Sequence, residues 1–249
     1  RPGSEPALLT QLPERIRLLR EAGADDVRVV PFTTDLMRYS PVEFVAKVLM
    51  PLQPAVICVG SNFTFGARAS GTVQTLRELG EGRYRVAEVG LAEVDGTTTC
   101  SSLVRQALSS GDVGEAARHL GRPFRFGGVV VMGHQRGREL GFPTANIPVG
   151  RGMAVPADGV YAGWLTVEGE RLATAVSVGR NPTFDDVPEA MVEAHVLDRD
   201  DLNLYGRWVD VDFVERLRGN EKFDGVDDLV QQIHADIARS RDVLGLSAS

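Results

Sequence analysis

The chain contains the segment Gly133-His134-Gln135-Arg136-Gly137-Arg138-Glu139-Leu140-Gly141-Phe142-Pro143-Thr144-Ala145-Asn146. An apolar run from Val129 to Met132 comes directly before it and predicts a β-strand. Its three glycines lie four residues apart, and glycine lets the backbone turn tightly and approach a ligand closely. Arg136 and Arg138 add positive charge to the same stretch. The segment therefore predicts a strand that leads into a basic glycine loop.

Two neutral oxygen donors, Thr144 and Asn146, end this segment. Because they are two residues apart, they share one face if the backbone is extended. Mg²⁺ prefers oxygen ligands and shares them with substrate phosphates, so the segment predicts a site for a phosphate–Mg²⁺ complex. A plain glycine-rich hairpin would show the same glycines and arginines. The spacing is not that of a Walker A loop, which has four residues between its glycines and then Lys.

The segment from Leu140 to Asn146, with the glycines before it, resembles the signature of riboflavin kinases. Further matches follow in order along the chain: Pro156 to Tyr161, Val178 to Phe184, Val192-Glu193, Asp201 to Gly206, Arg218, and Glu221 to Phe223. Together these matches cover most of residues 121–244. The region upstream resembles the other module of bacterial bifunctional FAD synthetases, the FMN adenylyltransferase.

The resemblance implies roles for particular residues. Glu193 would be the base that takes the proton from the ribityl 5′-hydroxyl of riboflavin, although a solvated strand glutamate is the plain alternative. Thr144 and Asn146 would hold Mg²⁺, and Arg218 would help to place the flavin, unless it is only a surface arginine. The residues expected to bind ATP are Gly133, Gly137, Arg138, Gly141, Phe142 and Pro143. ATP would be the co-substrate, with riboflavin as substrate and FMN as product.

Residues 1–120 alternate helical and strand patterns, which predicts a three-layer α/β domain. Val27 to Val30 predicts a short strand, and the unbroken apolar run Ala55 to Val59 predicts a parallel strand covered on both faces. The resemblance narrows this region to an incomplete Rossmann-like nucleotidyltransferase domain. The modules it resembles begin with a strand and a histidine- and glycine-containing turn. Residues 1–30 contain no histidine, and His119 is the first in the chain, so we expect that this opening is missing.

Two pieces of the adenylyltransferase module are still recognisable. The loop after the Ala55–Val59 run supplies Gly60, Asn62, Phe63 and Phe65, and in the resembled family such a loop helps to bind the nucleotide or flavin. The alternative is a strand-to-helix turn with two core phenylalanines. A serine-rich turn before a helix supplies Ser101, Ser102 and Arg105. A helix N-terminus with an arginine suits a phosphate, but an ordinary capped helix with a solvated arginine explains the same residues.

Residues 121–249 show recurrent short strand patterns without interleaved helices, which predicts an antiparallel barrel or sandwich. The clearest pattern is Arg207–Val214, where apolar and polar residues alternate. An amphipathic helix that Asp224 can cap, with an apolar stripe from Val226 to Leu244, ends the chain. The resemblance sharpens this to a small antiparallel Greek-key β-barrel with a C-terminal helix. We therefore expect a partial FMN adenylyltransferase-like α/β domain over residues 1–120 and a riboflavin kinase-like barrel over residues 121–249.

The composition limits the functional classes. The chain has 249 residues and a formal net charge of -7, which argues against a general nucleic-acid binder. No apolar run is long enough for a membrane span. Cys58 and Cys100 have neither disulfide-framework nor metal-site spacing, so a cytoplasmic protein is the simplest interpretation. We expect small-molecule partners, no nucleic acid and no membrane, and a homo-oligomer is compatible with the sequence.

Three functions stay open at this point. The chain is the kinase-complete part of a bifunctional FAD synthetase, or it belongs to a fully bifunctional protein whose histidine turn lies upstream of Arg1. The third is a non-catalytic flavin-binding or assembly protein. For the 249-residue chain we expect FMN to be formed and FAD not to be formed.

Overall fold

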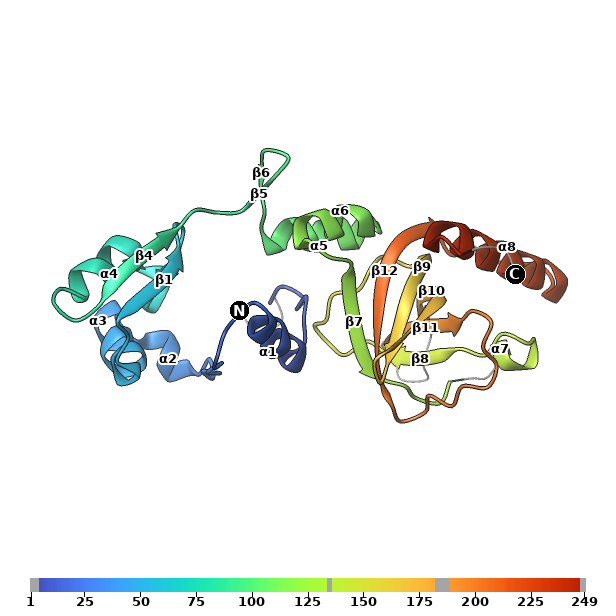
Figure 1. The fold of residues 1–249 in the computed structure, drawn as a ribbon, viewed down its shortest axis with the longest axis horizontal. Helices are drawn as coiled ribbons and strands as arrows, with labels where there is room; N and C mark the ends of the chain where they lie inside the picture. Colours follow the sequence, from blue (N-terminus) through green and yellow to red (C-terminus); the bar gives the residue numbers. More distant parts are fainter. Residues whose placement is uncertain (1–4, 134–135, 182–188, 247–249) are drawn as a thin grey trace. The chain divides into compact units, whose positions relative to one another are not determined.

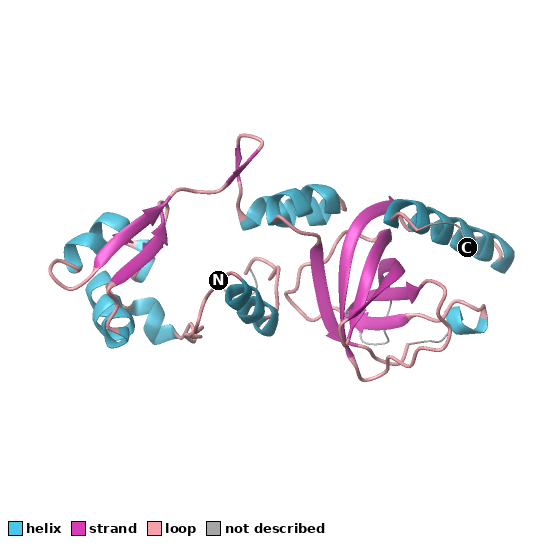
Figure 2. Cartoon of the chain, in the orientation of Figure 1, coloured by secondary structure: helices cyan, strands magenta, loops and turns pink. Residues whose placement is uncertain are grey.

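The chain forms two compact units in the computed structural model, which describes residues 5–133, 136–181 and 189–246 (Figures 1 and 2). One unit contains Arg1–Ala22 together with Cys100–Ser249, and the other contains Gly23–Thr99. Antiparallel strands and helices build the first unit. A parallel strand pair, two short antiparallel hairpins and helices build the second. Among the described residues, no helix has the length and apolar character that a membrane crossing requires.

Six antiparallel strands form a nearly closed barrel in the first unit. They are β7 (Phe124–Val129), β8 (Ala145–Pro148), β9 (Gly159–Val167), β10 (Glu170–Asn181), β11 (Glu189–Val196) and β12 (Trp208–Arg218). Their order in the sheet is β7-β12-β9-β10-β11-β8, so β12 returns from β11 to lie between β7 and β9. A bridge from Val131 N–H to the Asn146 carbonyl, 2.8 Å long, joins the two ends. The expected small barrel is confirmed.

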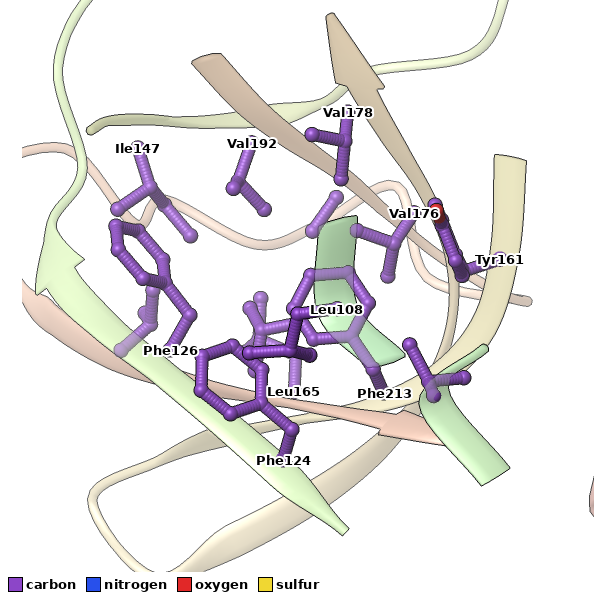
Figure 3. Close-up of a cluster of buried hydrophobic side chains, with 14 of the residues drawn as sticks. Leu108, Phe124, Phe126, Ile147, Tyr161, Leu165, Val176, Val178, Val192 and Phe213 are labelled. Atoms are coloured by element: carbon purple, nitrogen blue, oxygen red, sulfur yellow. The ribbon is translucent and has the colours of Figure 1, made fainter. Parts of the chain in front are cut away.

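The barrel interior is filled by one hydrophobic core (Figure 3). On β12, Val209, Val211 and Phe213 are completely buried, as the alternating pattern predicts. Phe213 meets Tyr161 edge to face, with ring centroids 5.4 Å apart, and it also contacts Phe124. Each of these large side chains contributes roughly 1.5–3 kcal/mol by burial, so the barrel supplies most of the hydrophobic stabilisation of its unit.

The apolar run before the glycine loop is not one strand. Strand β7 ends at Val129, and Val130 still pairs with the segment just before β12, because its N–H donates to the Arg207 carbonyl at 3.0 Å. Val131 then bridges to Asn146 of β8. Met132 is 70% exposed. The run therefore crosses from one neighbouring strand to another, and the strand expected over Val129–Met132 is wrong for this reason.

The C-terminal helix α8 (Val226–Leu244) packs against β9, β10 and β12. A buried ion pair holds it, since Arg218 at the end of β12 donates to both carboxylate oxygens of Asp236 at 2.7–3.2 Å. Gln232, one turn earlier on the helix, donates to the same carboxylate at 2.9 Å. Helix α8 begins with Gly225 as its N-cap and no side-chain cap, so Asp224 does not have the capping position that the sequence suggests.

Besides α8, three described helices of eight residues or more belong to the barrel unit. They are α1 (Leu12–Glu21), α5 (Ser101–Ser110) and α6 (Val113–Leu120). Val104 and Leu108 from α5 and Val113 from α6 join the same core as the barrel strands. The compact units therefore divide the chain differently from the boundary expected between residues 120 and 121. As the limit of the two modules, that boundary stays a prediction.

The second unit has a small parallel sheet of β1 (Val56–Gly60) and β4 (Arg85–Val89). Its other elements are α2 (Thr34–Arg38), α3 (Pro41–Phe44), the π-helix η1 (Val45–Leu49), the 3-10 helices η2 (Met50–Leu52) and η3 (Ala67–Ala69), α4 (Val73–Leu79), and the short hairpins β2 (Thr64–Phe65) with β3 (Gly71–Thr72) and β5 (Glu93–Val94) with β6 (Thr97–Thr98). Helix α3 starts with the capping box of Ser40 and Glu43. The buried core of this second unit consists of Val45, Phe65 and Leu76.

Two expectations for this unit are wrong. No strand forms over Val27 to Val30, and Val29 and Val30 are about half exposed. Strand β1 is not covered on both faces, since Val56 is 42% exposed. A parallel strand becomes fully buried only when neighbouring strands and helices on both faces surround it, and β1 has β4 as its one partner among the described strands.

The buried ion pair on α8 gives a stability prediction. Replacing Asp236 with Ala leaves the Arg218 guanidinium largely buried without its partner, so we expect a loss of about 3 kcal/mol in the free energy of unfolding. Urea unfolding followed by the fluorescence of Trp164 and Trp208, which both lie in the barrel, measures this loss. The control is Asp242→Ala, because Asp242 is an exposed carboxylate on the same helix. Equal midpoints for the two variants would show that the pair contributes nothing.

Candidate active site

Strands β8 and β11 bring the predicted metal and base residues together. Asn146 and Glu193 are direct partners in their antiparallel ladder. Opposed residues in such a ladder project their side chains to the same face, so both project from the same side of the barrel wall. The neighbours Val192 and Ala194 are buried in the core, which puts Glu193 on the outer face. The two residues therefore share one surface.

Asn146 is held by the residue two positions before it. Its Nδ2 donates to the Thr144 carbonyl at 3.1 Å and lies 3.3 Å from the Thr144 hydroxyl. Its side chain is almost fully buried, with 8% exposed. A Cβ on Gly133 would lie only 2.5 Å from Asn146 Oδ1. Gly133 is therefore required so that the loop can pack against this amide.

The other two glycines shape the loop itself. Helix α7 (Arg136–Glu139) is a single turn that begins it. The Gly137 carbonyl accepts a 2.7 Å hydrogen bond from the Phe142 N–H, and a Cβ on Gly137 would stand 2.6 Å from the Phe142 carbonyl oxygen. Gly141 has a φ of +88°, which is strained for residues with a side chain. These glycines allow the loop to fold back toward β8.

A cavity of about 530 Å³ lies beside this loop. One wall consists of loop residues and the start of β8, namely Arg138, Gly141, Pro143, Thr144 and Asn146. The segment 200–205 forms much of the remaining wall. Of the residues predicted to bind ATP, Arg138, Gly141 and Pro143 line this cavity. Gly133, Gly137 and Phe142 are not among its lining residues, and they contact residues of the loop and of β8 instead.

The charges of the cavity are unequally available to a ligand. Arg199 donates to Asp201 at 2.6 Å and to Glu170 at 3.0 Å, so its charge is already compensated. The same hydrogen bond lowers the pKa of the Asp201 carboxyl below its usual value. Arg138 forms no ion pair within the part of the chain that the structure describes. It is therefore the cation of this cavity that is best placed to meet an anionic ligand.

The predicted flavin residue Arg218 is engaged within the protein. The hydrogen bonds that Arg218 donates to Asp236 raise the pKa of Arg218, and its guanidinium also lies 5.8 Å from the centre of the Phe223 ring. Arg218 therefore anchors helix α8. A contact between Arg218 and a flavin stays a prediction.

The two adenylyltransferase remnants lie in different compact units. Gly60 ends β1 and Asn62 is exposed in the turn after it. Phe63 and Phe65 stack with ring centroids 5.6 Å apart, and both pack into the small core, so they have the packing role that the plain alternative predicts. A nucleotide role for this loop stays a prediction.

The second remnant is the first turn of α5. Ser101 and Ser102 are exposed there, and Arg105 donates to the Ala7 carbonyl at 2.6 Å. The arginine is therefore tied to the segment before α1 rather than solvated. Its role toward a phosphate stays a prediction.

Two histidines to which the sequence assigns no role contact the glycine loop. His195 on β11 and His234 on α8 both touch the Phe142 ring. His195 was visible as the next outward-facing residue after Glu193. His234 had no signal in the sequence, because only the fold brings α8 to this loop.

An antiparallel barrel with a basic glycine loop and a Thr–Asn–Glu group beside a cavity has the features of a nucleotide-dependent phosphotransferase. Residues 120–244 match the family model of riboflavin kinase, and residues 1–103 match that of FAD synthetase. The bifunctional riboflavin kinase/FMN adenylyltransferase of Listeria monocytogenes is 32% identical over 92% of this chain and 72% of its own length. The protein of the same name from Escherichia coli K12 is 34% identical over 97% and 77%. The chain belongs to this family, and its barrel is a riboflavin kinase domain.

One solved structure resembles nearly the whole chain. A crystal structure described as a macrolide-efflux protein from Streptococcus pneumoniae superposes with a TM-score of 0.84 and 32% sequence identity. The match covers 94% of this chain and 75% of that protein. Its name differs from those of the curated relatives. The family models and the curated relatives agree with each other, and the assignment rests on them.

The contact between Gly133 and Asn146 gives a prediction about the metal site. In Gly133→Ala the new methyl group must displace the Asn146 amide, and we expect the riboflavin kinase rate to fall roughly 10-fold to 100-fold. The Mg²⁺ concentration for half-maximal rate should rise at the same time. Gly150→Ala is the control, because the nearest atom to its Cβ is 3.9 Å away. An unchanged Mg²⁺ dependence in Gly133→Ala would contradict a metal role for Asn146.

Proposed function

We propose that the barrel transfers the γ-phosphoryl group of ATP to the ribityl 5′-hydroxyl of riboflavin, with Mg²⁺ as cofactor. The observation that carries this proposal is the register of β8 and β11, which places Asn146 opposite Glu193. Thr144 and Asn146 also line the cavity that contains Arg138. The expected metal ligands and a cation thus line one cavity, and Glu193 stands opposite Asn146 in the ladder without being one of the residues that line that cavity.

The neutral oxygens of this wall fit Mg²⁺ bound to a nucleotide. No group of three or more His, Cys, Asp or Glu that could hold a metal occurs in residues 5–133, 136–181 and 189–246. The phosphates would therefore supply the anionic ligands, as is common for Mg²⁺. Asn146 Nδ2 lies 3.3 Å from the Thr144 hydroxyl oxygen, and a half-turn of the amide would exchange it for Oδ1. Thr144 and Asn146 would then both offer neutral oxygens to Mg²⁺, which would neutralise charge on the phosphates.

The chain's residues then divide the chemical work. Glu193 accepts the proton of the 5′-hydroxyl as that oxygen forms its bond to the γ-phosphorus. The bond from the γ-phosphorus to the β,γ-bridging oxygen breaks, and ADP leaves with that electron pair. Arg138 offsets negative charge on the phosphates. Bound Mg²⁺ would supply further charge neutralisation, and most of the catalysis is positioning and electrostatic stabilisation.

Glu193→Gln tests the assignment of the base. The change keeps the size of the side chain and removes its basicity, so we expect kcat to fall about 100-fold or more while riboflavin binding changes less than about threefold. FMN formation measured by chromatography gives kcat, and quenching of riboflavin fluorescence gives binding. Glu215→Gln, at another strand glutamate of the barrel, should retain normal kcat.

Two outcomes would contradict this proposal. Lost flavin binding with normal residual turnover in Glu193→Gln would show that Glu193 is a binding residue and not the base. A folded wild-type chain that binds flavin but forms no FMN would favour a non-catalytic flavin-binding or assembly protein instead.

We further propose that the 249-residue chain forms FMN but not FAD. Residues 1–103 match the FAD synthetase model, yet the sequence reaches its first histidine only at His119, in helix α6. The histidine- and glycine-containing turn that the resemblance leads us to expect for adenylyl transfer is therefore not among these residues. Incubation with riboflavin, ATP and Mg²⁺ should give FMN that persists. Accumulation of FAD would show that other residues of the chain carry adenylyl transfer.

The remaining expectations about partners are proposals as well. Riboflavin, FMN and ATP are small molecules, and the net charge of -7 gives no support for a nucleic-acid partner. A cytoplasmic location fits two cysteines that are both free and exposed. Assembly of the chain into a homo-oligomer is compatible with the sequence and stays a proposal.

A further inference from the structure

One aromatic side chain, Phe142, holds the cavity-lining loop on the side that faces away from the cavity. Gly141 and Pro143 line the cavity, whereas Phe142 between them is turned away from it and is only 9% exposed. Its ring meets His195 of β11 with centroids 5.8 Å apart and planes at 79°. It meets His234 of α8 at 5.2 Å and 77°. Two imidazoles therefore make edge contacts with the same ring.

A backbone hydrogen bond strengthens the contact with β11. His195 Nδ1 lies 2.9 Å from the Pro143 carbonyl oxygen. Because a carbonyl can only accept, Nδ1 carries the proton and donates it. The residue that follows this carbonyl is Thr144, so the hydrogen bond fixes the backbone directly before the predicted metal ligands. His195 also lies two positions after Glu193 on the same face of β11.

The contact from α8 is anchored independently. His234 lies two residues before Asp236, which pairs with Arg218 at the end of β12. Gln232 donates to the same carboxylate and holds that turn of the helix. The helix is thereby attached to the barrel next to His234, and His234 itself is exposed. An exposed side chain adds little to the core of the barrel.

We propose that His195 and His234 are positioning residues that clamp Phe142. They thereby keep the cavity-lining residues of the loop in place to bind a nucleoside triphosphate. This inference rests on the proposed kinase function. The clamp fixes the loop between β11 and α8, so that Gly141, Thr144 and Arg138 face the cavity. Losing either imidazole leaves the loop able to shift, which weakens the binding of the nucleotide and leaves the flavin largely unaffected.

The first experiment uses the exposed member of the clamp. His234→Ala removes the edge contact, and we expect the KM for ATP and the Kd for ADP with Mg²⁺ to rise about fivefold to tenfold. The KM for riboflavin and the thermal midpoint should stay near the wild-type values. His234→Phe restores an aromatic edge and should recover most of the nucleotide affinity. Gln231→Ala, at an exposed position three residues before His234, is the control and should leave all four quantities unchanged.

The second experiment separates the two contacts of His195. His195→Asn keeps a donor near the position of Nδ1 and loses the ring, whereas His195→Phe keeps a ring and loses the donor. We expect each variant to recover part of the nucleotide affinity that His195→Ala loses. Combining His195→Ala with His234→Ala should weaken nucleotide binding by less than the product of the single effects, because both act through Phe142.

The outcomes separate this inference from the proposed function. A wild-type chain without kinase activity overturns the proposed function, while the Kd for ADP still tests the clamp. An active wild type with an unchanged nucleotide affinity in a folded His234→Ala overturns the clamp alone. An equal rise in the KM for riboflavin and for ATP, or a failure of His234→Phe to recover affinity, also overturns it, because the histidine would then act on the whole barrel.

Discussion

The register between β8 and β11 is the constraint on which the site depends. A slip of one residue would move Asn146 out of line with Glu193 and turn one of them into the core. The register is fixed because Ile147 and Val192, which are direct partners in the ladder, are both completely buried. Apolar packing inside the barrel therefore determines which polar groups meet on its outside. The functional surface is a consequence of the core.

The glycine loop shows why a motif alone leaves two interpretations open. Gly133 and Gly137 are required by contacts inside the protein, with Asn146 and with the Phe142 carbonyl, whatever the loop binds. A hairpin and a phosphate loop would both need them. Arg138 and Thr144 line the same cavity, which favours the phosphate-binding interpretation, and that interpretation stays a prediction.

Much of the barrel could be predicted because its strands carry their own signal. The alternation along β12 gives the buried face of Val209 and Val211 correctly, since a half-buried strand has a period of two. The run Val129–Met132 wrongly predicts a single strand. Its residues are all apolar, but the segment with which they pair changes within the run. Val27 to Val30 misled for the opposite reason, as a strand-like composition forms no strand without a neighbour. In both cases the decisive partner is distant in sequence.

The residues of the candidate site also differ in whether their partners are near or distant in sequence. Thr144 and Asn146 are close in sequence, so their spacing alone places them on one face. Glu193 joins them only through the topology of the sheet, and His234 only through the packing of α8, so no local pattern reveals these neighbours. Arg218 is the opposite example. Its charge would suit a ligand, but in the fold it forms an ion pair with Asp236. A buried guanidinium without a partner destabilises the fold, so the protein itself supplies the partner of Arg218. What sequence spacing predicts at this site is therefore limited to residues whose partners are neighbours along the chain.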